Sequence, residues 1–356
     1  MRRLLMLLLA LTLAFGCALA EEDEELSILD VLNEVHPDVV EDTIVQPPTE
    51  EEIAEQEAAS IYEPDGSVLI TLSAAGDLRL GGELYEAELA KYAGDAAFVM
   101  RNIRETMMED DLTIVNVDGA TAESAAMLPL NGVEAVTLAN DGTQAMDEAA
   151  RQELRQALED GGATCADAGE IAVREVKGLK IALLSYDCST GYEKLWNRIP
   201  QDVAAAKTQY PVVIASFHWG SENSYMTDGD QVQMGRLAVD SGADLVLGHR
   251  SRRIQPIEFY NGAYICYSLG SFCYTAEEKP SDMSSFIFQL RLRLRDGVLT
   301  QEGFRILPIR ISSRTDRNDF APSLMDKVTA VDSILGILKE NGRTLQYAVE
   351  QYPVAW

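Results

Sequence analysis

The chain has 356 residues, of which 47% are hydrophobic and 24% are charged. This composition is that of a globular protein with enough chain to bury a core, and it excludes a collagen-like, a wholly disordered and a polytopic membrane protein. Fifty-eight acidic residues against 29 lysines and arginines give a formal net charge of −29. Because there is also no long basic stripe, the sequence argues against a nucleic-acid partner and against binding to an anionic membrane surface.

The first twenty residues have the pattern of a secretory signal peptide. Arg2 and Arg3 precede an unbroken apolar run over 4–15, and residues 18–20 form a small-x-small cleavage site. The run is short for a membrane-spanning helix, so an uncleaved anchor is the less favoured interpretation. Lipidation of Cys17 is a second alternative, although the leucine usual three residues before such a cysteine is missing. We therefore expect an exported, extracellular or cell-surface protein, held at the membrane only by this segment or by a lipid on Cys17.

Residues 21–63 form a segment of different composition. They contain sixteen acidic residues, no lysine or arginine, and only short apolar clusters. Such a segment buries too little apolar surface to offset the entropy lost on ordering, so we predict a flexible acidic spacer. Residues 64–356 are predicted to form the folded domain. Its four cysteines fit neither a zinc ribbon nor a small cystine scaffold, which leaves their pairing open.

From residue 68, short apolar runs of buried-strand type alternate with amphipathic stretches. The strands are expected at 68–74, 112–117, 135–138, 180–185, 212–217 and 244–247. Helices are expected over 95–108, from a Thr143 cap to Leu158, and over 230–241. After residue 254 the pattern changes to four antiparallel strands and a final helix, expected at 254–260, 263–268, 286–294, 298–311 and 323–340. This order predicts a layered α/β sandwich with a strand-rich second half.

Polar side chains follow several of these strands at the point where each strand ends. They are Asp77, Asn116, Asp118, Asn140, Asp141, His218 and His249. Because the carboxyl ends of strands converge on one edge of an α/β sheet, we expect these side chains to lie close together. Each one also has an ordinary explanation as a turn, a helix cap or a buried histidine. Both histidines of the folded part fall at equivalent strand ends, however, and together with the carboxylates they indicate a site for Zn, Mn or Fe.

The order of these motifs resembles that of the CapA-type poly-γ-glutamate biosynthesis proteins of the calcineurin-like metallophosphatase superfamily. The similar motifs are G-D at 76–77, A-N at 139–140, H-W-G-x-E at 218–222, Q-P-I-E at 255–258 and Y-S-L-G-S-F at 267–272. The resemblance implies a four-layer α/β/β/α sandwich. It also implies a divalent metal, Mn, Fe or Zn, with His218 and His249 as catalytic residues and a ligand set of Asp77, Asp118, Asp141, His218 and His249.

The sequence departs from the family pattern at several of these positions. Asp118 replaces a glutamate, Gly142 replaces a histidine, and Arg250 and Arg252 stand where the family has histidines. Guanidinium groups cannot ligate a metal, so the site would hold one ion well and a second one poorly. The two arginines either clamp an anionic group of a substrate or pair with Asp77 or Asp118 as salt bridges in a decayed site. Trp219 is either a packing residue or a substrate-stacking ring at the rim of a pocket.

Two functions follow as hypotheses. The first is an exported, metal-dependent hydrolase of phosphoesters or amides that acts in the synthesis of poly-γ-glutamate or a similar capsule polymer. The second is a catalytically silent protein of the same fold that assembles, tethers or binds such a polymer. In both cases the expected partner is an anionic cell-surface polymer or its assembly machinery, with no nucleic acid involved. The substrate, the identity of the metal and the oligomeric state stay open.

Overall fold

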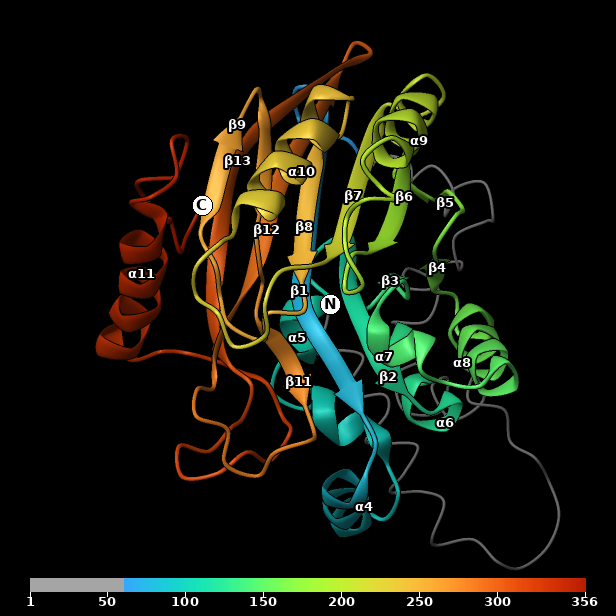
Figure 1. Ribbon diagram of the computed structural model, residues 1–356, viewed down its shortest axis with the longest axis vertical. Helices are drawn as coiled ribbons and strands as arrows, with labels where there is room; N and C mark the ends of the chain where they lie inside the picture. Colours follow the sequence, from blue (N-terminus) through green and yellow to red (C-terminus); the bar gives the residue numbers. More distant parts are fainter. Residues whose placement is uncertain (1–60) are drawn as a thin grey trace, which may run out of the picture. The chain divides into compact units, whose positions relative to one another are not determined.

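The computed structural model describes residues 61–356. The predicted signal peptide, Cys17 and the spacer up to residue 60 lie outside the described residues. Residues 61–356 form two β-sheets that face each other, with helices on both outer faces (Figure 1). The predicted four-layer α/β/β/α sandwich is therefore confirmed. Within these residues, no helix combines the length and the apolar character needed to cross a membrane.

The first sheet has the strand order β14-β13-β12-β1-β2-β3-β4, and β11 pairs with the end of β1. Strands β1 to β4 are parallel neighbours, whereas β12 and β13 run antiparallel to the strands beside them. The bounds are β1 (Val68–Leu80), β2 (Leu112–Ala120), β3 (Ala135–Thr137), β4 (Thr164–Ala166), β11 (Ser271–Tyr274), β12 (Ser284–Arg295), β13 (Val298–Arg310) and β14 (Ser323–Leu324).

The second sheet has the order β5-β6-β7-β8-β10-β9. Its four central strands are parallel, and the two edge strands β5 and β9 are antiparallel to their neighbours. The bounds are β5 (Ala172–Val176), β6 (Leu179–Asp187), β7 (Val212–His218), β8 (Leu245–His249), β9 (Ile257–Tyr260) and β10 (Ala263–Cys266).

Helices cover the outer faces of the two sheets, except the last helix, which lies at the side of the sandwich and contributes Ile334 and Leu338 to the cluster between the sheets (Figure 1). The α-helices are α4 (Glu83–Leu89), α5 (Arg104–Met107), α6 (Ala122–Ala125), α7 (Asp141–Gln144), α8 (Glu148–Asp160), α9 (Arg198–Lys207), α10 (Gly229–Asp240) and α11 (Val328–Gly342). Short 3-10 turns cover Ala90–Tyr92, Ala96–Met100 and Pro129–Asn131.

Three buried hydrophobic clusters hold these layers together. Between the sheets, Leu72 of the first sheet packs in one cluster with Leu247 of the second. On the outer face of the first sheet, Val117 shares a cluster with Leu154 of α8. On the outer face of the second sheet, Phe217 shares a cluster with residues of α9 and α10. Central strands such as β7 are buried on both faces, and their sequences are therefore continuous apolar runs rather than alternating patterns.

The sequence analysis missed α4 and α9, and three of the helices that it predicted differ from the structure. The single helix expected over 95–108 is a 3-10 turn followed by α5, because Phe98, Val99 and Met100 are all buried and leave no solvent face for an amphipathic helix. The helix expected from Thr143 is two helices, since Asn140 caps α7 and Asp147 caps α8. The last helix begins only at residue 328, because residues 323–324 pair with β13.

Candidate metal centre

The two sheets bring their strand ends to one edge of the sandwich. Asp77 in β1 lies opposite Asn116 in β2, and His218 at the end of β7 lies opposite His249 at the end of β8. Asp141 is the first residue of α7, which follows β3. The carboxyl ends of parallel strands in both sheets thus supply one polar cluster, as the strand pattern predicts.

Asp118, Asp141 and His218 form the centre of this cluster. Each offers a ligand atom, and these three atoms all lie within 4.8 Å of one another. His218 Nε2 lies 2.9 Å from Asp141 Oδ1. Asp118 and His218 are buried, whereas Asp141 is partly exposed. Such an arrangement of two carboxylates and an imidazole matches the donor set of divalent transition metals.

Asp77 and His249 adjoin this trio. His249 Nδ1 lies 3.4 Å from Asp77 Oδ1, and both side chains are buried. The same carboxylate accepts hydrogen bonds from Asn116 Nδ2 at 2.8 Å and from the backbone N–H of Arg250 at 2.9 Å. These donors fix the orientation of Asp77 without neutralising its charge. The structure therefore brings together all five side chains that the resemblance implies as metal ligands.

A buried amide network positions the loop that carries Asp141. Asn140 donates to Asn116 Oδ1 at 3.1 Å and to the carbonyl of Val117 at 2.8 Å, and its own Oδ1 accepts the N–H of Thr143 at 2.7 Å. Asn140 thereby caps α7 and ties it to β2. The sequence marks both asparagines as ends of strands, but only the structure shows that they hold Asp77 and the loop of Asp141 through hydrogen bonds.

Several polar atoms of the cluster have no hydrogen-bond partner within residues 61–356. These buried atoms are Asp118 Oδ1, His218 Nδ1, and both ring nitrogens of His249. Burying a polar atom without a partner costs free energy, so a protein retains such atoms where something else binds them. Unpartnered carboxylate oxygen and imidazole nitrogen are metal-ligand atoms, and the residues present therefore fit a divalent cation.

The pKa values of the carboxylates are driven apart. Burial, reinforced by the charge of Asp77, raises the pKa of Asp118 to about 7. The hydrogen bond with His218 instead lowers the pKa of Asp141 to about 2. Burial lowers the pKa of His218, but its hydrogen bond to Asp141 and the neighbouring carboxylate charges outweigh burial, so the pKa lies above its ordinary value. A concentration of negative charge in a buried site is what a bound cation relieves.

Gly142 shows why one family histidine has no counterpart here. A Cβ atom at this position would lie 2.2 Å from Asp118 Oδ1 and 2.8 Å from the Asp118 carbonyl oxygen. The Asp118 carboxylate thus occupies the space that any side chain at position 142 would need. The position of Asp118 is therefore compatible with glycine at 142 and not with the histidine of the family pattern.

The two arginines after His249 have different surroundings, although both have left-handed backbone, with φ of 84° at Arg250 and 58° at Arg252. Arg250 turns toward the site: its Nε lies 3.6 Å from Asp141 Oδ2, and its Nη1 donates to the carbonyl of Gly220. Arg252 points away and is bound by Glu222 at 3.3 Å and the Tyr274 hydroxyl at 2.8 Å. The predicted pairing of these arginines with Asp77 or Asp118 is absent from the described contacts.

Trp219 does not lie at the rim of a pocket. Its side chain is fully buried and stacks on Phe217 with ring centroids 4.5 Å apart. Its Nε1 donates to the carbonyl of Tyr267 at 2.8 Å. Because the ring is enclosed in the hydrophobic cluster under α9 and α10, it is not accessible to a substrate. This placement corrects the alternative of a stacking ring and agrees with the packing one.

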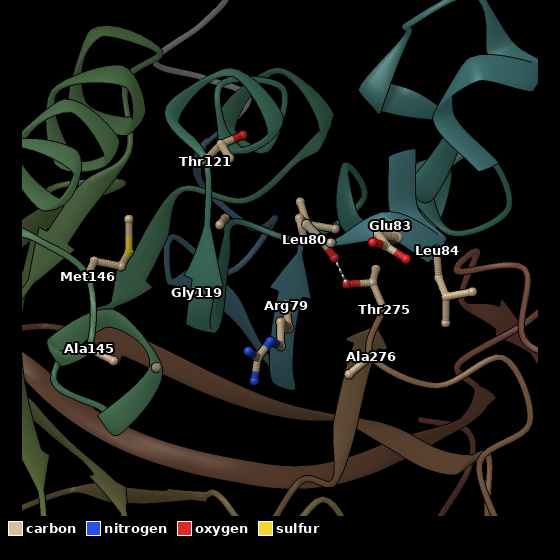
Figure 2. Close-up of a pocket in the computed structure, with 14 residues that line it drawn as sticks. Arg79, Leu80, Glu83, Leu84, Gly119, Thr121, Ala145, Met146, Thr275 and Ala276 are labelled. Atoms are coloured by element: carbon tan, nitrogen blue, oxygen red, sulfur yellow. Dashed lines mark hydrogen bonds between the residues drawn. The ribbon is translucent and has the colours of Figure 1, made fainter. Parts of the chain in front are cut away.

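A pocket of about 630 Å³ opens beside the cluster (Figure 2). Gly119 and Gly142, which directly follow Asp118 and Asp141, form part of its wall. Arg79 projects into it from β1 as a charged residue that the sequence reading missed. The signal available in the sequence was its position two residues after Asp77 on the same strand.

The fold and the site together define a four-layer α/β sandwich with a carboxylate–histidine cluster where the parallel strands of two mixed sheets end. Residues 71–275 match the family described as "Bacterial capsule synthesis protein PGA_cap", and the chain belongs to that family. The family that the motifs indicated is thereby confirmed.

Relatives of known name agree with this assignment. The chain is 33% identical over 148 residues to "PGA biosynthesis protein CapA" of Bacillus subtilis (strain 168), covering 37% of this chain and 39% of the relative. It is 32% identical over 118 residues to a "Probable polyglutamine synthesis accessory protein" of Mycobacterium tuberculosis, covering 32% of this chain and 31% of the relative. It is 21% identical over 245 residues to "Capsule biosynthesis protein CapA" of Bacillus anthracis, covering 58% and 60%. The matches thus span less than two thirds of each relative.

Similar solved structures include phosphatases. One is a phosphatase from Mycoplasma pneumoniae, 11% identical, with a TM-score of 0.46 over 74% of this chain and 96% of that one. Another is the calcineurin-like phosphoesterase YfkN from Bacillus subtilis, 12% identical, with a TM-score of 0.41 over 78% and 100%.

Proposed function

We propose that this protein acts outside the cytoplasm in the synthesis of a capsule-type surface polymer, as a divalent-metal-dependent hydrolase of a phosphoester or an amide. Membership of the capsule synthesis family and the names of the relatives support the polymer. The pattern of residues 1–20 supports export. The partner would be the anionic polymer itself or the machinery that assembles it.

One observation carries the metal-dependent part of the proposal. Ligand atoms of Asp118, Asp141 and His218 lie within 4.8 Å of one another at the strand ends, next to the Asp77–His249 pair. Asp118, His218 and His249 also carry buried polar atoms that have no hydrogen-bond partner among residues 61–356. These five residues would hold Mn, Fe or Zn. When bound, such an ion polarises the scissile group and lowers the pKa of a coordinated water.

The protein's own residues would position and stabilise the reacting group. Asn116 and the backbone N–H of Arg250 hold the Asp77 carboxylate in place. The guanidinium of Arg250, next to Asp141, places a permanent positive charge at the edge of the site. A fixed cation there would stabilise negative charge that develops on an ester or amide oxygen. We infer that Arg250 would supply positive charge that a second ion would supply in a related two-metal site.

A second candidate function is a catalytically silent protein that assembles, tethers or binds the polymer. The observation that favours it is the pairing of Arg250 with Asp141 together with the absence of any side chain at Gly142. In this case the guanidinium would neutralise the carboxylate that a metal needs. The formal charge of −29 opposes passive binding of a polyanion, so contact would depend on local basic positions.

The metal content of the purified protein tests the proposal. Inductively coupled plasma mass spectrometry on protein prepared without chelator should find about one Mn, Fe or Zn ion per chain. His218→Ala and His249→Ala should each lose the ion while keeping the circular dichroism spectrum. His36→Ala, which removes the third histidine of the sequence, is the matched control and should keep it.

The result also separates the two candidate functions. A metal-loaded protein that cleaves phosphoesters or γ-glutamyl amides, and whose histidine variants do not, is the proposed hydrolase. A wild-type protein that takes up no ion, even after incubation with each metal, would contradict the hydrolase and favour the silent role. Equal metal content in wild type and both histidine variants would show that His218 and His249 do not bind the ion.

A further inference from the structure

The pocket beside the candidate metal centre is lined by a cation that has no partner among the described residues. Arg79 is exposed at the pocket wall, and no hydrogen bond or ion pair of its side chain occurs among residues 61–356. Most arginines near it are engaged, as Arg250 is by Asp141 and Arg252 by Glu222. Figure 2 shows the guanidinium of Arg79 directed into the pocket. A free guanidinium in a concave site is a position for an anionic ligand group.

The pocket adjoins the candidate metal centre through two glycines. Gly119 and Gly142 line the pocket and are the immediate neighbours of Asp118 and Asp141. A ligand bound at Arg79 would therefore extend toward the group that the metal centre receives.

The rest of the lining specifies the chemistry of the ligand. Leu84, Ala145, Met146 and Ala276 present apolar surface, which suits methylene groups. The pocket also contains Glu83, and the carboxylates of the metal centre lie beside it. This negative surrounding disfavours a phosphate dianion more than a singly charged group. A planar carboxylate also matches the two parallel N–H donors of one guanidinium.

We infer that this pocket is a carboxylate subsite, in which Arg79 binds a carboxylate carried on a short methylene arm of the molecule that the neighbouring centre receives. The inference rests on the proposed function, because the neighbouring centre is taken to receive the rest of the ligand. The subsite itself binds the carboxylate through Arg79 alone. Arg79 is thus a specificity residue that selects acidic substrates.

Binding of glutarate tests this assignment directly. Isothermal titration calorimetry on the purified protein, without added metal, should detect glutarate and not its uncharged diamide, glutaramide. Arg79→Gln should weaken glutarate binding by at least about tenfold, because a bidentate charge-assisted contact is lost. Arg79→Lys keeps the charge but loses the planar fork, and should fall between the two. Arg104→Gln, which removes an exposed arginine outside the pocket, is the matched control and should bind as wild type does.

A second variant leaves Arg79 in place. Ala145→Glu puts a carboxylate into the same pocket at an exposed position and should compete with the ligand for the guanidinium. It should weaken binding about as much as Arg79→Gln does. Unchanged melting temperatures would show that both variants are folded.

The outcomes separate the subsite from the metal centre. Absent glutarate binding in wild type, or equal binding in wild type and Arg79→Gln, overturns the subsite even if the histidine variants lose metal. Inorganic phosphate that binds more tightly than glutarate, and depends on Arg79, overturns the assigned ligand class. Arg79-dependent glutarate binding in a protein that takes up no metal would support the subsite while contradicting the hydrolase.

Discussion

At the scale of single residues, the candidate site is marked by buried polar atoms that have no hydrogen-bond partner among residues 61–356. Asp118 Oδ1 and His249 Nε2 have no partner within the described part of the chain, yet both are enclosed. The backbone around them is also constrained, since Arg250 has a left-handed φ of 84°. Strained backbone and unpartnered polar atoms are both costly, and they occur together at functional sites.

Gly142 gives the first prediction at this scale. In Gly142→Ala the new Cβ would overlap Asp118 Oδ1, so the carboxylate must move. We expect metal affinity to fall by at least about tenfold and the free energy of unfolding to fall by about 1–3 kcal/mol. Metal titration and urea unfolding measure the two effects.

Gly229→Ala is the control for that substitution. A Cβ at Gly229 meets no atom within 4 Å, so we expect unchanged metal affinity. If Gly142→Ala bound metal as tightly as wild type, Asp118 would not be a ligand.

Asp110 gives a pH-dependent prediction away from the site. It lies two residues before β2, and its Oδ2 accepts a hydrogen bond from Thr113 Oγ1 at 2.7 Å. Its buried Oδ1 has no partner within residues 61–356. Burial raises its pKa to about 7, with help from the charges of Glu134 and Asp111. As the pH rises from about 4 to about 7, the unfolded chain loses this proton while the folded chain keeps it, so stability falls over that window.

Asp110→Asn should remove this loss. The asparagine side chain is uncharged at every pH. We expect the free energy of unfolding of the variant to exceed that of wild type by about 1–3 kcal/mol at pH 8, and the difference to vanish near pH 4. Urea unfolding at both pH values measures the change. Glu105→Gln removes one charge at an exposed position and controls for net charge. A constant difference between Asp110→Asn and wild type across this range would exclude titration of Asp110 as its cause.

At the scale of elements, a buried ion pair joins the second sheet to its covering helix. Glu258 of β9 is fully buried and accepts two hydrogen bonds from Arg236 of α10, at 2.6 and 3.1 Å. The Tyr267 hydroxyl donates to it at 2.7 Å, and the backbone N–H of Tyr347 donates at 3.1 Å. One carboxylate therefore connects β9, α10, the segment after β10 and the segment after α11.

Removing this carboxylate should destabilise the protein strongly. Glu258→Ala leaves the guanidinium and the tyrosine hydroxyl without their partner, and we expect a loss of about 3–5 kcal/mol in the free energy of unfolding. Glu340→Ala breaks the exposed pair with Arg343 and should cost about 0.5 kcal/mol or less. Similar losses in the two variants, measured by urea unfolding, would contradict the structural role of Glu258.

At the scale of the whole molecule, the described domain is held by packing and not by covalent cross-links. Its four cysteines, Cys165, Cys188, Cys266 and Cys273, are all free and buried. Burial raises the pKa of the Cys165 thiol to about 12 and that of Cys266 well above its ordinary value. Thiols of this kind are poor nucleophiles, because the reactive form is the thiolate.

The four cysteines should therefore be unreactive and form no disulfide in the native protein, even after export into an oxidising compartment. In a Cys17→Ser background, a thiol reagent such as dithionitrobenzoate should label almost no cysteine in the native state and all four after unfolding. A reducing agent should leave the melting temperature unchanged. A melting temperature that falls on reduction would show that a disulfide contributes to stability.

The features that the sequence by itself determined are those written in local patterns. Apolar runs marked β1, β2, β6, β7 and β8, because strands buried on both faces carry continuous apolar sequence. The strand-end motifs located the candidate metal centre, because parallel strands end at a common edge. Short elements such as β4 and β11 escaped prediction, since three or four residues carry too little periodicity to identify a strand.

Only the tertiary structure decided how individual side chains are used. Arg250 and Arg252 are two residues apart, yet one faces Asp141 and the other Glu222. Trp219 lies in the core, and Arg79 lies in the pocket beside the metal centre. These differences come from side-chain direction and from contacts between residues far apart in the chain, which pattern and spacing do not encode.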